Sequence, residues 1–456
     1  MYKKILIASL ALIAGLASCK KDDPTPSPNP PSTLTIDGVA SSLEFYQLDT
    51  AHLSVAGVAK DAAAKAVWAV NGAKAAEGAT FDFTTAHPGK YEVTLTVDGK
   101  SAKHTYTVAP RFSEGAFLLN EGNFGNETGS LTYIHPSKKL VIDQAYYRVN
   151  GTKLGNVCQD LAFGNDQIYI LSQLGPKNGG EGLLTIARSN SLEKVKVYND
   201  EALAQSTPTH IAVLRDHIYI RTERDGILRG SSEGGFTPIT GTKKALKQRM
   251  AQIGERIFAL TKDNKILMIQ GTQVVRELDL SPAKPSGIAV SHDGKLWVST
   301  TSPNAILKVD PTPDNFVALD THILDKSISA TGPESWQRTT SSAFFAHGDK
   351  LYFTGQSSVI YCHDFATSKT SQVIDVKTID GVGTSANMYY NSLGVDPATG
   401  ELYYAAFEGY STYNKKNVTI VLKADGTKLL LKEKVNSFPA GFYFIPNAAS
   451  RTGANR

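Results

Sequence analysis

The sequence predicts an all-β protein in which a small immunoglobulin-like β-sandwich precedes a seven-bladed β-propeller. A unit made of a strand, a polar turn and an aromatic-centred strand recurs through most of the chain after residue 110. Four short strands in every roughly 40 to 50 residues are typical of a propeller blade. The two ends of the repeat region each carry a strand without a partner, and together these strands can complete one further blade.

The repeat unit occurs six times in complete form. Its second strand holds a large aromatic residue in each copy: Tyr169, Tyr219, Phe258, Trp297, Tyr352 and Tyr403. A third strand follows, as in residues 182–186 and 305–309, and then a weaker fourth. A helical solenoid would need amphipathic stretches with a helical period, and only residues 245–253 hint at one. The copies therefore predict six blades with all four strands.

The seventh blade is predicted from the two ends of the repeat region, which spans residues 111–450. The chain enters this region at residues 115–121, which look like a second strand without a first. It leaves at residues 441–446, which look like a first strand without a second. Pairing of these two segments would close the ring and leave no open sheet edge. We therefore expect the C-terminal strand to be the innermost strand of the first blade.

Residues 34–109 have the pattern of a separate β-sandwich. Apolar and polar residues alternate in four runs separated by turns: residues 53–55, 67–70, 81–83 and 91–97. The succession of Trp68, Asn71-Gly72, Phe81 and Tyr91 resembles the PKD-like immunoglobulin-type modules of bacterial surface proteins. The resemblance implies that Trp68 and Tyr91 are core residues and that the module acts as a spacer.

Residues 1–18 are predicted to be a lipoprotein signal peptide. Lys3 and Lys4 form a basic start, and residues 5–14 form an apolar stretch too short to span a bilayer. The segment Leu16-Ala-Ser-Cys19 then resembles the lipobox of bacterial lipoproteins, in which cleavage leaves a lipid-modified cysteine at the new N-terminus. Cys19 is therefore the predicted lipidation site.

Residues 19–33 are predicted to carry an export signal and a linker. Lys21, Asp22 and Asp23 resemble the surface-export signal of lipoproteins in Bacteroides and its relatives. The Pro-rich run of residues 24–32 is typical of an extended spacer. The apolar stretches later in the sequence are too short to span a membrane, so the lipid on the cysteine would be the membrane anchor. These features predict a protein anchored in the outer membrane that faces the cell exterior.

Composition and charge exclude several functional classes. Hydrophobic residues make up 41% and charged residues 20% of the chain, as in an ordinary soluble globular protein. The formal charge is +4, and loss of the two signal-peptide lysines leaves +2 without a dense basic cluster, so we expect no nucleic-acid partner. Besides Cys19 the chain has Cys158 and Cys362, too few for a disulfide framework, and we expect both to be buried free thiols.

Motifs for catalysis are scarce, and we expect no enzyme activity, no catalytic residue, no cofactor and no metal. Residues 230–234 match the G-x-S-x-G pattern of serine hydrolases, but they lie between two outer strands without a following helix, which predicts a polar hairpin turn. The sequence has no zinc-protease, phosphate-loop or dinucleotide motif. Histidines spread over several blades leave an axial metal site open as an alternative: His210, His217, His292, His322, His347 and His363.

Loops at one mouth of the ring differ in length, and the longer ones indicate a ligand site. Loops between second and third strands share this mouth with the loops that lead into each new blade. We expect minimal loops in blades three and four and longer ones in blades one, two, six and seven. The longer loops mix aromatic residues with Asn, Gln and Arg, which is typical of small-molecule sites. The predicted ligand-binding residues are Asn120, Glu121, Asn123, Phe124, Gln173, Trp336, Arg338, Asn387, Tyr389, Tyr390, Asn391 and Tyr410.

The start of the repeat region resembles a known family. Residues 118–126, Leu-Leu-Asn-Glu-Gly-Asn-Phe-Gly-Asn, and residues 129–133, Gly-Ser-Leu-Thr-Tyr, are similar to the opening of the surface propeller lipoproteins of Bacteroides-type bacteria. Members of that family include cobalamin-binding lipoproteins that sit over a TonB-dependent outer-membrane transporter and hand it the vitamin. The resemblance implies capture of cobalamin or a related corrinoid as a transported ligand, and a monomer apart from the transporter. The PKD-like module departs from those compact binders and puts the ligand in question.

Three other functions stay open. Glycans also favour aromatic platforms with amide groups, so a glycan-binding surface lipoprotein is the main alternative. A lactonase- or quinoprotein-like propeller enzyme would need metal ligands on the first strands, where the sequence has mostly apolar or small residues. A structural adhesion protein would use the propeller as a protein-binding disc.

Overall fold

The structure, a computed structural model, describes residues 33–39, 44–328, 344–355, 357–390 and 392–446. Within these residues nearly all regular structure is β-strand, so the all-β prediction is confirmed. The described residues divide into two compact units: residues 33–39, 51–83 and 91–106 form the first, and residues 44–50, 84–90 and the described part of 107–446 form the second. Two segments of the region predicted as a sandwich, residues 44–50 and 84–90, thus group with the second unit.

The first unit is built on two sheets. One has three strands in the order β1 (Thr35–Asp37), β3 (Thr50–Ala56) and β6 (Thr80–Thr84). The other has the order β8 (Lys100–Ala109), β7 (Gly89–Val97), β4 (Val67–Val70) and β5 (Ala73–Glu77). The last two residues of β8 belong to the second unit, where they pair in parallel with β2 (Phe45–Tyr46). The four runs predicted as strands lie in β3, β4, β6 and β7. The immunoglobulin-like class of this unit stays a prediction.

Aromatic side chains form much of the core of the first unit. Trp68 is fully buried, and its indole Nε1 donates a hydrogen bond to the carbonyl oxygen of Gly78 at 2.9 Å. The ring of Phe83, also buried, packs against Tyr106 at 4.7 Å and against Tyr91 at 5.8 Å between centroids. Trp68 is therefore a core residue, as the sequence predicts, whereas Tyr91 is half-buried beside the core.

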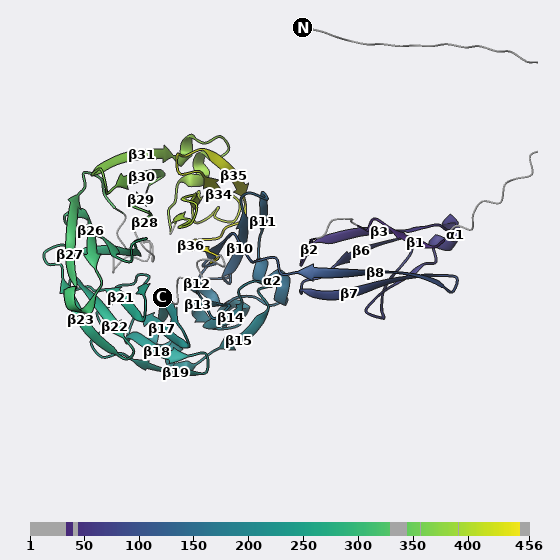
Figure 1. The fold of residues 1–456 in the computed structure, drawn as a ribbon, viewed down its shortest axis with the longest axis horizontal. Helices are drawn as coiled ribbons and strands as arrows, with labels where there is room; N and C mark the ends of the chain where they lie inside the picture. Colours follow the sequence, from purple (N-terminus) through teal and green to yellow (C-terminus); the bar gives the residue numbers. More distant parts are fainter. Residues whose placement is uncertain (1–32, 40–43, 329–343, 356, 391, 447–456) are drawn as a thin grey trace, which may run out of the picture. The chain divides into compact units, whose positions relative to one another are not determined.

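The second unit is a β-propeller, as the repeat predicts. In its described residues, seven four-stranded sheets follow one another around a ring (Figure 1). We number these sheets blades one to seven in chain order. Blades two to seven each use four consecutive strands. Blade two has β12 (Asn156–Gly164), β13 (Gln167–Gly175), β14 (Leu184–Arg188) and β15 (Lys194–Tyr198); blade three has β16 (Pro208–Leu214), β17 (His217–Thr222), β18 (Gly226–Ser231) and β19 (Gly234–Pro238); and blade four has β20 (Ala251–Ile253), β21 (Arg256–Leu260), β22 (Lys265–Gln270) and β23 (Gln273–Asp279). Blade five has β24 (Pro285–Val290), β25 (Leu296–Thr301), β26 (Asn304–Asp310) and β27 (Val317–Ile323); blade six has β28 (Phe344–His347), β29 (Lys350–Thr354), β30 (Val359–Asp364) and β31 (Lys369–Asp375); and blade seven has β32 (Leu393–Val395), β33 (Leu402–Phe407), β34 (Asn417–Leu422) and β35 (Lys428–Glu433).

Blade one combines both ends of the repeat region. From the ring centre outward its strands are β36 (Pro439–Phe444), β9 (Ala116–Asn120), β10 (Ser130–His135) and β11 (Leu140–Ile142) (Figure 1). In the antiparallel register of β36 and β9, Phe442 lies opposite Leu118. The predicted closure of the ring by the C-terminal strand is confirmed, and every blade then has four strands.

Burial explains why the repeat is visible in the sequence. The aromatic residues predicted at the centres of the second strands all lie there and are buried: Tyr169, Tyr219, Phe258, Trp297, Tyr352 and Tyr403. Second strands are covered on both faces because each blade packs between two others, and β33 is buried at all six positions. Fourth strands are different, since β27 exposes most of its residues to solvent.

Helices are short and lie between strands. They are α1 (Lys60–Ala63), α2 (Ala145–Asn150), α3 (Glu201–Ser206) and the 3-10 turns η1 (Lys177–Gly179), η2 (Pro313–Asn315), η3 (Val376–Thr378) and η4 (Gly383–Ala386). Among the described residues, no helix has the length and apolar character needed to cross a membrane. Cys158 and Cys362 are buried free thiols, as expected.

Candidate functional site

One edge of the ring gathers loops that were predicted to bind a ligand. In an antiparallel sheet, the turn between the second and third strands lies at the same end as the link into the next sheet. We call this edge the mouth; blades one and seven contribute to it residues 121–129, 376–390, 408–416 and 434–438. The Glu121 amide donates a hydrogen bond to the Phe438 carbonyl at 2.8 Å, and the Ser437 hydroxyl donates one to Glu127 at 2.7 Å. These bonds join the second–third strand loop of blade one to the loop that leads into its closing strand.

An aromatic cluster at the mouth surrounds Phe438, a residue that the sequence analysis missed. The rings of Phe407, Tyr390, Tyr410 and Tyr413 lie with centroids 4.6 to 5.9 Å from that of Phe438. The hydroxyl oxygens of Tyr390 and Tyr410 are 3.3 Å apart. Phe438 is buried, whereas Tyr410 is 37% exposed. The cluster therefore combines the partly exposed ring of Tyr410 with rings that are buried or half-buried.

Asn120 and Asn123, both predicted ligand contacts, are hydrogen-bonded within the mouth. Asn120 is fully buried; its Nδ2 donates to the hydroxyls of Ser130 at 3.2 Å and Thr132 at 3.3 Å, and its Oδ1 accepts from the Ser437 amide at 3.1 Å. The Oδ1 of Asn123 accepts from the Gly125 amide at 2.9 Å. The side chain of Asn120 therefore uses its hydrogen bonds to hold the loops of the mouth together. The side chain of Asn123 stabilises the turn in its own loop.

Phe124 is the most exposed aromatic side chain of the mouth, with 64% of its surface accessible. The Lys177 ammonium lies 3.8 Å from the centroid of the Phe124 ring, and the Phe124 carbonyl accepts a hydrogen bond from the Asn178 side chain at 3.3 Å. These contacts bring together the predicted loops of blades one and two. A cavity of about 210 Å³ opens beside them, and its polar lining includes Asn126, Glu127, Gln144, Tyr147, Lys153 and Asn178.

Glu121 is a half-buried carboxyl at the mouth whose surroundings favour its neutral form. Burial raises the pKa of Glu121 to about 7, and the charge of Lys247 and a hydrogen bond from Gln159 oppose that rise. The Gln159 Nε2 donates to Glu121 at 2.9 Å. Burial and the hydrogen bond with Tyr410, together with the charge of Glu121, raise the pKa of Tyr390. The carboxyl of Glu121 can therefore gain or lose a proton near neutral pH.

The loop that leads into blade four is longer than predicted, and this corrects the expectation of a minimal loop there. Strand β19 ends at residue 238 and β20 begins at residue 251. The intervening segment brings Lys247 to within 3.9 Å of Glu223, which also pairs with Arg221 at 3.0 Å. Buried Ala245 and Leu246 hold the segment against the blade. This apolar pair gave residues 245–253 their helical appearance, although the described structure has no helix there.

Asp160, Arg249 and Tyr443 form a buried polar group that joins three blades near the ring centre. The Arg249 Nε lies 3.2 Å from Asp160 Oδ1, the Tyr443 hydroxyl donates to the same oxygen at 2.7 Å, and the Ile211 amide donates to Oδ2 at 2.9 Å. Burial raises the pKa of Asp160, and Arg249 opposes that rise. A Cβ atom at Gly441 would collide with the guanidinium of Arg249, so the closing strand needs glycine at this position.

The first strands were predicted to be mostly apolar or small, so this polar group was not predicted. In β12, the innermost strand of blade two, Gln159 and Asp160 are both polar and almost fully buried. Gln159 faces Glu121, and Asp160 faces Arg249. The signal that could have found them is the adjacent Gln-Asp pair itself, because buried polar residues are rarely left without partners.

The remaining predicted residues are less closely grouped. Gln173 is half-buried in β13, Asn387 is exposed after η4, and Tyr389 packs beside the core of blades six and seven. Trp336, Arg338 and Asn391 lie outside the described residues, as do Cys19 and the export signal Lys21, Asp22 and Asp23.

The serine-hydrolase pattern at residues 230–234 has the predicted hairpin context. It links β18 to β19, and Ser231 lies opposite Gly234 in the sheet. Among the described residues, no three His, Cys, Asp or Glu side chains converge as a set of metal ligands.

Residues 114–446 match a protein family described as a domain of unknown function, DUF5074. The chain belongs to this family. The DUF5074 segment begins just before β9 and ends just after β36, so it takes in all seven sheets of the propeller. The family description names no ligand, and the cobalamin-binding resemblance and the PKD-like nature of the first unit stay predictions.

Solved structures similar to this DUF5074 protein share little of its sequence. A quinoprotein alcohol dehydrogenase-like protein from Bacteroides thetaiotaomicron matches with a TM-score of 0.58 and 16% identity, over 89% of this chain and 97% of that chain. A functionally unknown protein from Desulfotomaculum acetoxidans matches with a TM-score of 0.46 and 13% identity, over 73% of this chain and 99% of that chain. At 16% identity the first likeness supports the fold alone. Among curated proteins, none matches the sequence significantly.

Proposed function

We propose that this DUF5074 protein is a non-catalytic binding protein that captures a small-molecule ligand at the mouth of its propeller. The observation that carries the proposal is the presence of two exposed aromatic side chains, Phe124 and Tyr410, on loops that also hold amide and charged groups. Exposed aromatic side chains can pack against the flat apolar surfaces of a ligand. Their polar neighbours can fix the orientation of a bound molecule.

Cobalamin or a related corrinoid is the ligand that we propose to test first. A corrinoid has a large flat ring system fringed with amide groups, so aromatic faces and hydrogen-bonding side chains both find partners on it. The polar cavity beside Phe124, with Asn126, Gln144 and Lys153 in its lining, offers partners for such amides. The resemblance of residues 118–126 to the opening of corrinoid-binding lipoproteins supports the same choice.

At the level of the cell, we propose that Cys19 anchors the protein by lipid in the outer membrane and that Lys21, Asp22 and Asp23 direct it to the exterior. The protein would then pass its ligand to a TonB-dependent outer-membrane transporter. This part of the proposal rests on the N-terminal sequence and on the family resemblance.

Equilibrium dialysis of the purified protein against cobalamin tests the ligand, since corrinoids absorb visible light and need no label. A scavenger of a scarce vitamin is expected to bind with a nanomolar dissociation constant, about 12 kcal/mol of binding free energy. Phe124→Ala and Tyr410→Ala are each expected to weaken binding by about 2 kcal/mol, because aromatic anchors contribute most to such sites. Ser232→Ala, in the β18–β19 hairpin, is the control and should leave binding unchanged.

Two results would contradict parts of the proposal. Absence of binding at high micromolar cobalamin would refute the corrinoid and favour the glycan alternative, which the same variants test with oligosaccharides. Cobalamin binding that survives the loss of both Phe124 and Tyr410 would keep the ligand but refute the mouth as its site.

A further inference from the structure

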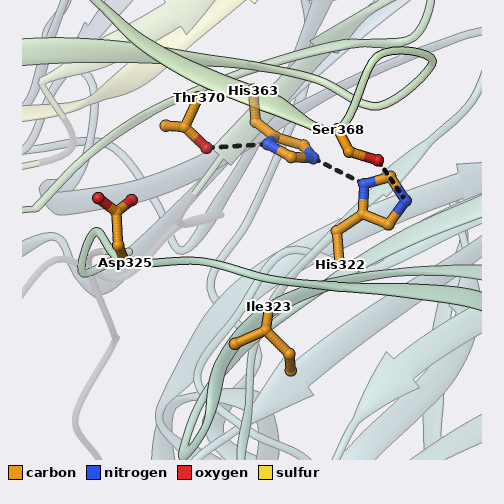
Figure 2. A pocket seen from close by; sticks show the side chains of 6 residues that line it. All are labelled: His322, Ile323, Asp325, His363, Ser368 and Thr370. Atoms are coloured by element: carbon orange, nitrogen blue, oxygen red, sulfur yellow. Dashed lines mark hydrogen bonds between the residues drawn. The ribbon is translucent and has the colours of Figure 1, made fainter.

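A second cavity, separate from the one at the mouth, lies between the outer strands of blades five and six. Its volume is about 350 Å³, and it is lined by His322, Ile323, Asp325, His363, Ser368 and Thr370 (Figure 2). The lining side chains come from the end of β27 in blade five and from β30, β31 and the turn between them in blade six. The proposed ligand site at the mouth uses none of these residues.

Two imidazole rings face each other at the wall of this cavity. The Nδ1 of His322 lies 2.9 Å from the Nε2 of His363, and the ring planes are inclined at 81° (Figure 2). His363 is 2% exposed and the side chain of His322 is 14% exposed. The facing nitrogens thus come from two different blades and meet where burial limits their contact with bulk water.

The remaining nitrogen of each ring has an oxygen partner that can accept a hydrogen bond. His363 Nδ1 lies 2.9 Å from the hydroxyl oxygen of Thr370. His322 Nε2 lies 3.4 Å from the hydroxyl of Ser368 and 3.5 Å from a carboxylate oxygen of Asp320. Each ring therefore has an oxygen partner behind it that can accept a hydrogen bond whenever the far nitrogen carries the proton.

Packing fixes the orientation of the His322 ring as well. It stacks on Phe365 with centroids 3.7 Å apart and planes inclined at 6°. Phe365 in turn packs against the buried Trp297 at 4.6 Å between centroids. Because Trp297 is fixed in the second strand of blade five, the imidazole is held between two blades in one orientation.

We propose that His322 and His363 bind a divalent late transition metal ion of the kind that favours imidazole, such as Zn²⁺ or Cu²⁺. Metal-ligating histidines as a rule donate their other ring N–H to a carboxylate or another oxygen. Here the Thr370 hydroxyl lies behind His363, and the Ser368 hydroxyl lies behind His322, with a carboxylate oxygen of Asp320 at 3.5 Å from the same nitrogen. Two Zn–N bonds in tetrahedral geometry set the nitrogens about 3.3 Å apart. The observed 2.9 Å spacing thus needs to widen by about 0.4 Å.

The cavity supplies room for the rest of the coordination shell. Among the described residues no third His, Cys, Asp or Glu completes a ligand set, so water molecules fill the other positions. The exposed carboxylate of Asp325, which forms an ion pair with Lys326 at 3.3 Å, stands across the cavity from the imidazoles (Figure 2), where it can accept hydrogen bonds from metal-bound water. Open positions of this kind suit an ion that exchanges or carries a small ligand, and not a closed structural site.

Metal binding requires a change in the bond between the two rings. In the metal-free protein one imidazole donates its N–H to the other across the 2.9 Å gap. A metal ion needs the lone pairs of both facing nitrogens, so the donating ring changes tautomer as the ion binds. Its proton leaves the facing nitrogen and a proton is taken up at its far nitrogen, so the two neutral rings still hold two protons in total. The Thr370 hydroxyl can follow this change because it both donates and accepts hydrogen bonds.

Calorimetric titration of the full chain with Zn²⁺ alone, on protein purified without a polyhistidine tag, tests the proposal. One ion is expected to bind per chain. His322→Gln and Asp320→Ala are each expected to weaken binding at least about tenfold, the first by removing a ligand and the second by removing the carboxylate behind it. His292→Gln, at an exposed histidine in the turn between β24 and β25, is the matched control and should not change the affinity.

Electron paramagnetic resonance of the Cu²⁺-loaded wild-type protein gives a readout that does not depend on the folding of any variant. Hyperfine coupling to two imidazole nitrogens is expected. Coupling to a single nitrogen, absence of Zn²⁺ binding at high micromolar concentration, or unchanged Zn²⁺ affinity in His322→Gln would each overturn the proposal. In those cases the two histidines are a hydrogen-bonded pair that joins two blades.

Discussion

Replacement of Arg249 by methionine tests whether the buried polar group near the ring centre holds three blades together. The change keeps much of the side-chain volume but leaves the Asp160 carboxyl, which is 1% exposed, without its cation. Tyr443 and the Ile211 amide still donate to that carboxyl. Removal of one partner of a buried ion pair costs about 3–5 kcal/mol, and loss of the cation over the Tyr443 ring, 4.1 Å away, adds to this. We therefore expect the free energy of unfolding to fall by about 3–5 kcal/mol.

Urea unfolding of the propeller, followed by tryptophan fluorescence at pH 7, measures this loss. Lys244→Met is the matched control in the same loop, because Lys244 forms an exposed ion pair with Asp263 and its loss is expected to cost less than about 1 kcal/mol. The double variant Asp160→Asn, Arg249→Met leaves no buried charge and is expected to be more stable than the single variant. A loss below about 1 kcal/mol in Arg249→Met, or a double variant that is no better, would refute the reasoning.

The same variant has a predicted pH dependence. Burial raises the folded-state pKa of Asp160 above its usual value, and loss of Arg249 removes an influence that lowers it. An acid whose pKa is higher in the folded than in the unfolded state destabilises the fold increasingly as pH rises through the unfolded pKa. The difference in free energy of unfolding between wild type and Arg249→Met is therefore expected to grow from acidic to neutral pH. A difference that stays constant between these conditions would mean that Arg249 does not change the pKa of Asp160 in the folded protein.

Three further predictions concern ring closure, the mouth and the membrane anchor. Truncation before Pro439 removes β36 and bares the edge of β9, so the melting temperature of the propeller is expected to fall sharply; an unchanged value would contradict the role of the closing strand. Glu121→Gln is expected to reduce the loss of stability as pH rises from 4.5 to about 7, because the folded state favours the protonated carboxyl; identical urea midpoints for the two proteins across that range would contradict this. Cys19→Ala is expected to release the protein from the membrane fraction, and Asp22→Ala with Asp23→Ala to leave it anchored but protected from protease added to intact cells; digestion of that double variant at the surface would contradict the export signal.

Most of the propeller could be predicted because its signals are local. Each second strand needs a large apolar centre to fill the space between two blades, and that requirement places residues such as Tyr219 and Trp297 at regular intervals in the sequence. Strand β36 could be predicted as well, because two half-blades at opposite ends of a repeat leave one way to satisfy both edges. Phe438 escaped notice because it stands alone in a loop, where nothing in the neighbouring sequence indicates that four other rings surround it.

The charged part of the site could not be predicted in the same way. Arg249 lies in a stretch with an apparent helical period, and its partner Asp160 is 89 positions away in the chain. Tyr443, the third member, is 283 positions from Asp160. Such pairings depend on which side chains the closed ring brings together, so they cannot be predicted from a local sequence pattern. The same holds for His322 and His363, which are 41 positions apart and belong to different blades.

The way blade one is assembled has a consequence for the order in which the molecule can fold. The hydrogen bond from the Ser437 amide to Asn120 spans 317 positions, so these contacts are among the longest-range in the chain. During synthesis β36 is made after every other strand of the ring, and until then β9 has a free inner edge. Completion of the propeller is therefore a late event set by the search of a chain end for its partner, and slow formation of such distant contacts is expected. A cell that makes this protein must keep an incomplete ring from pairing with other strands until its last six-residue strand arrives.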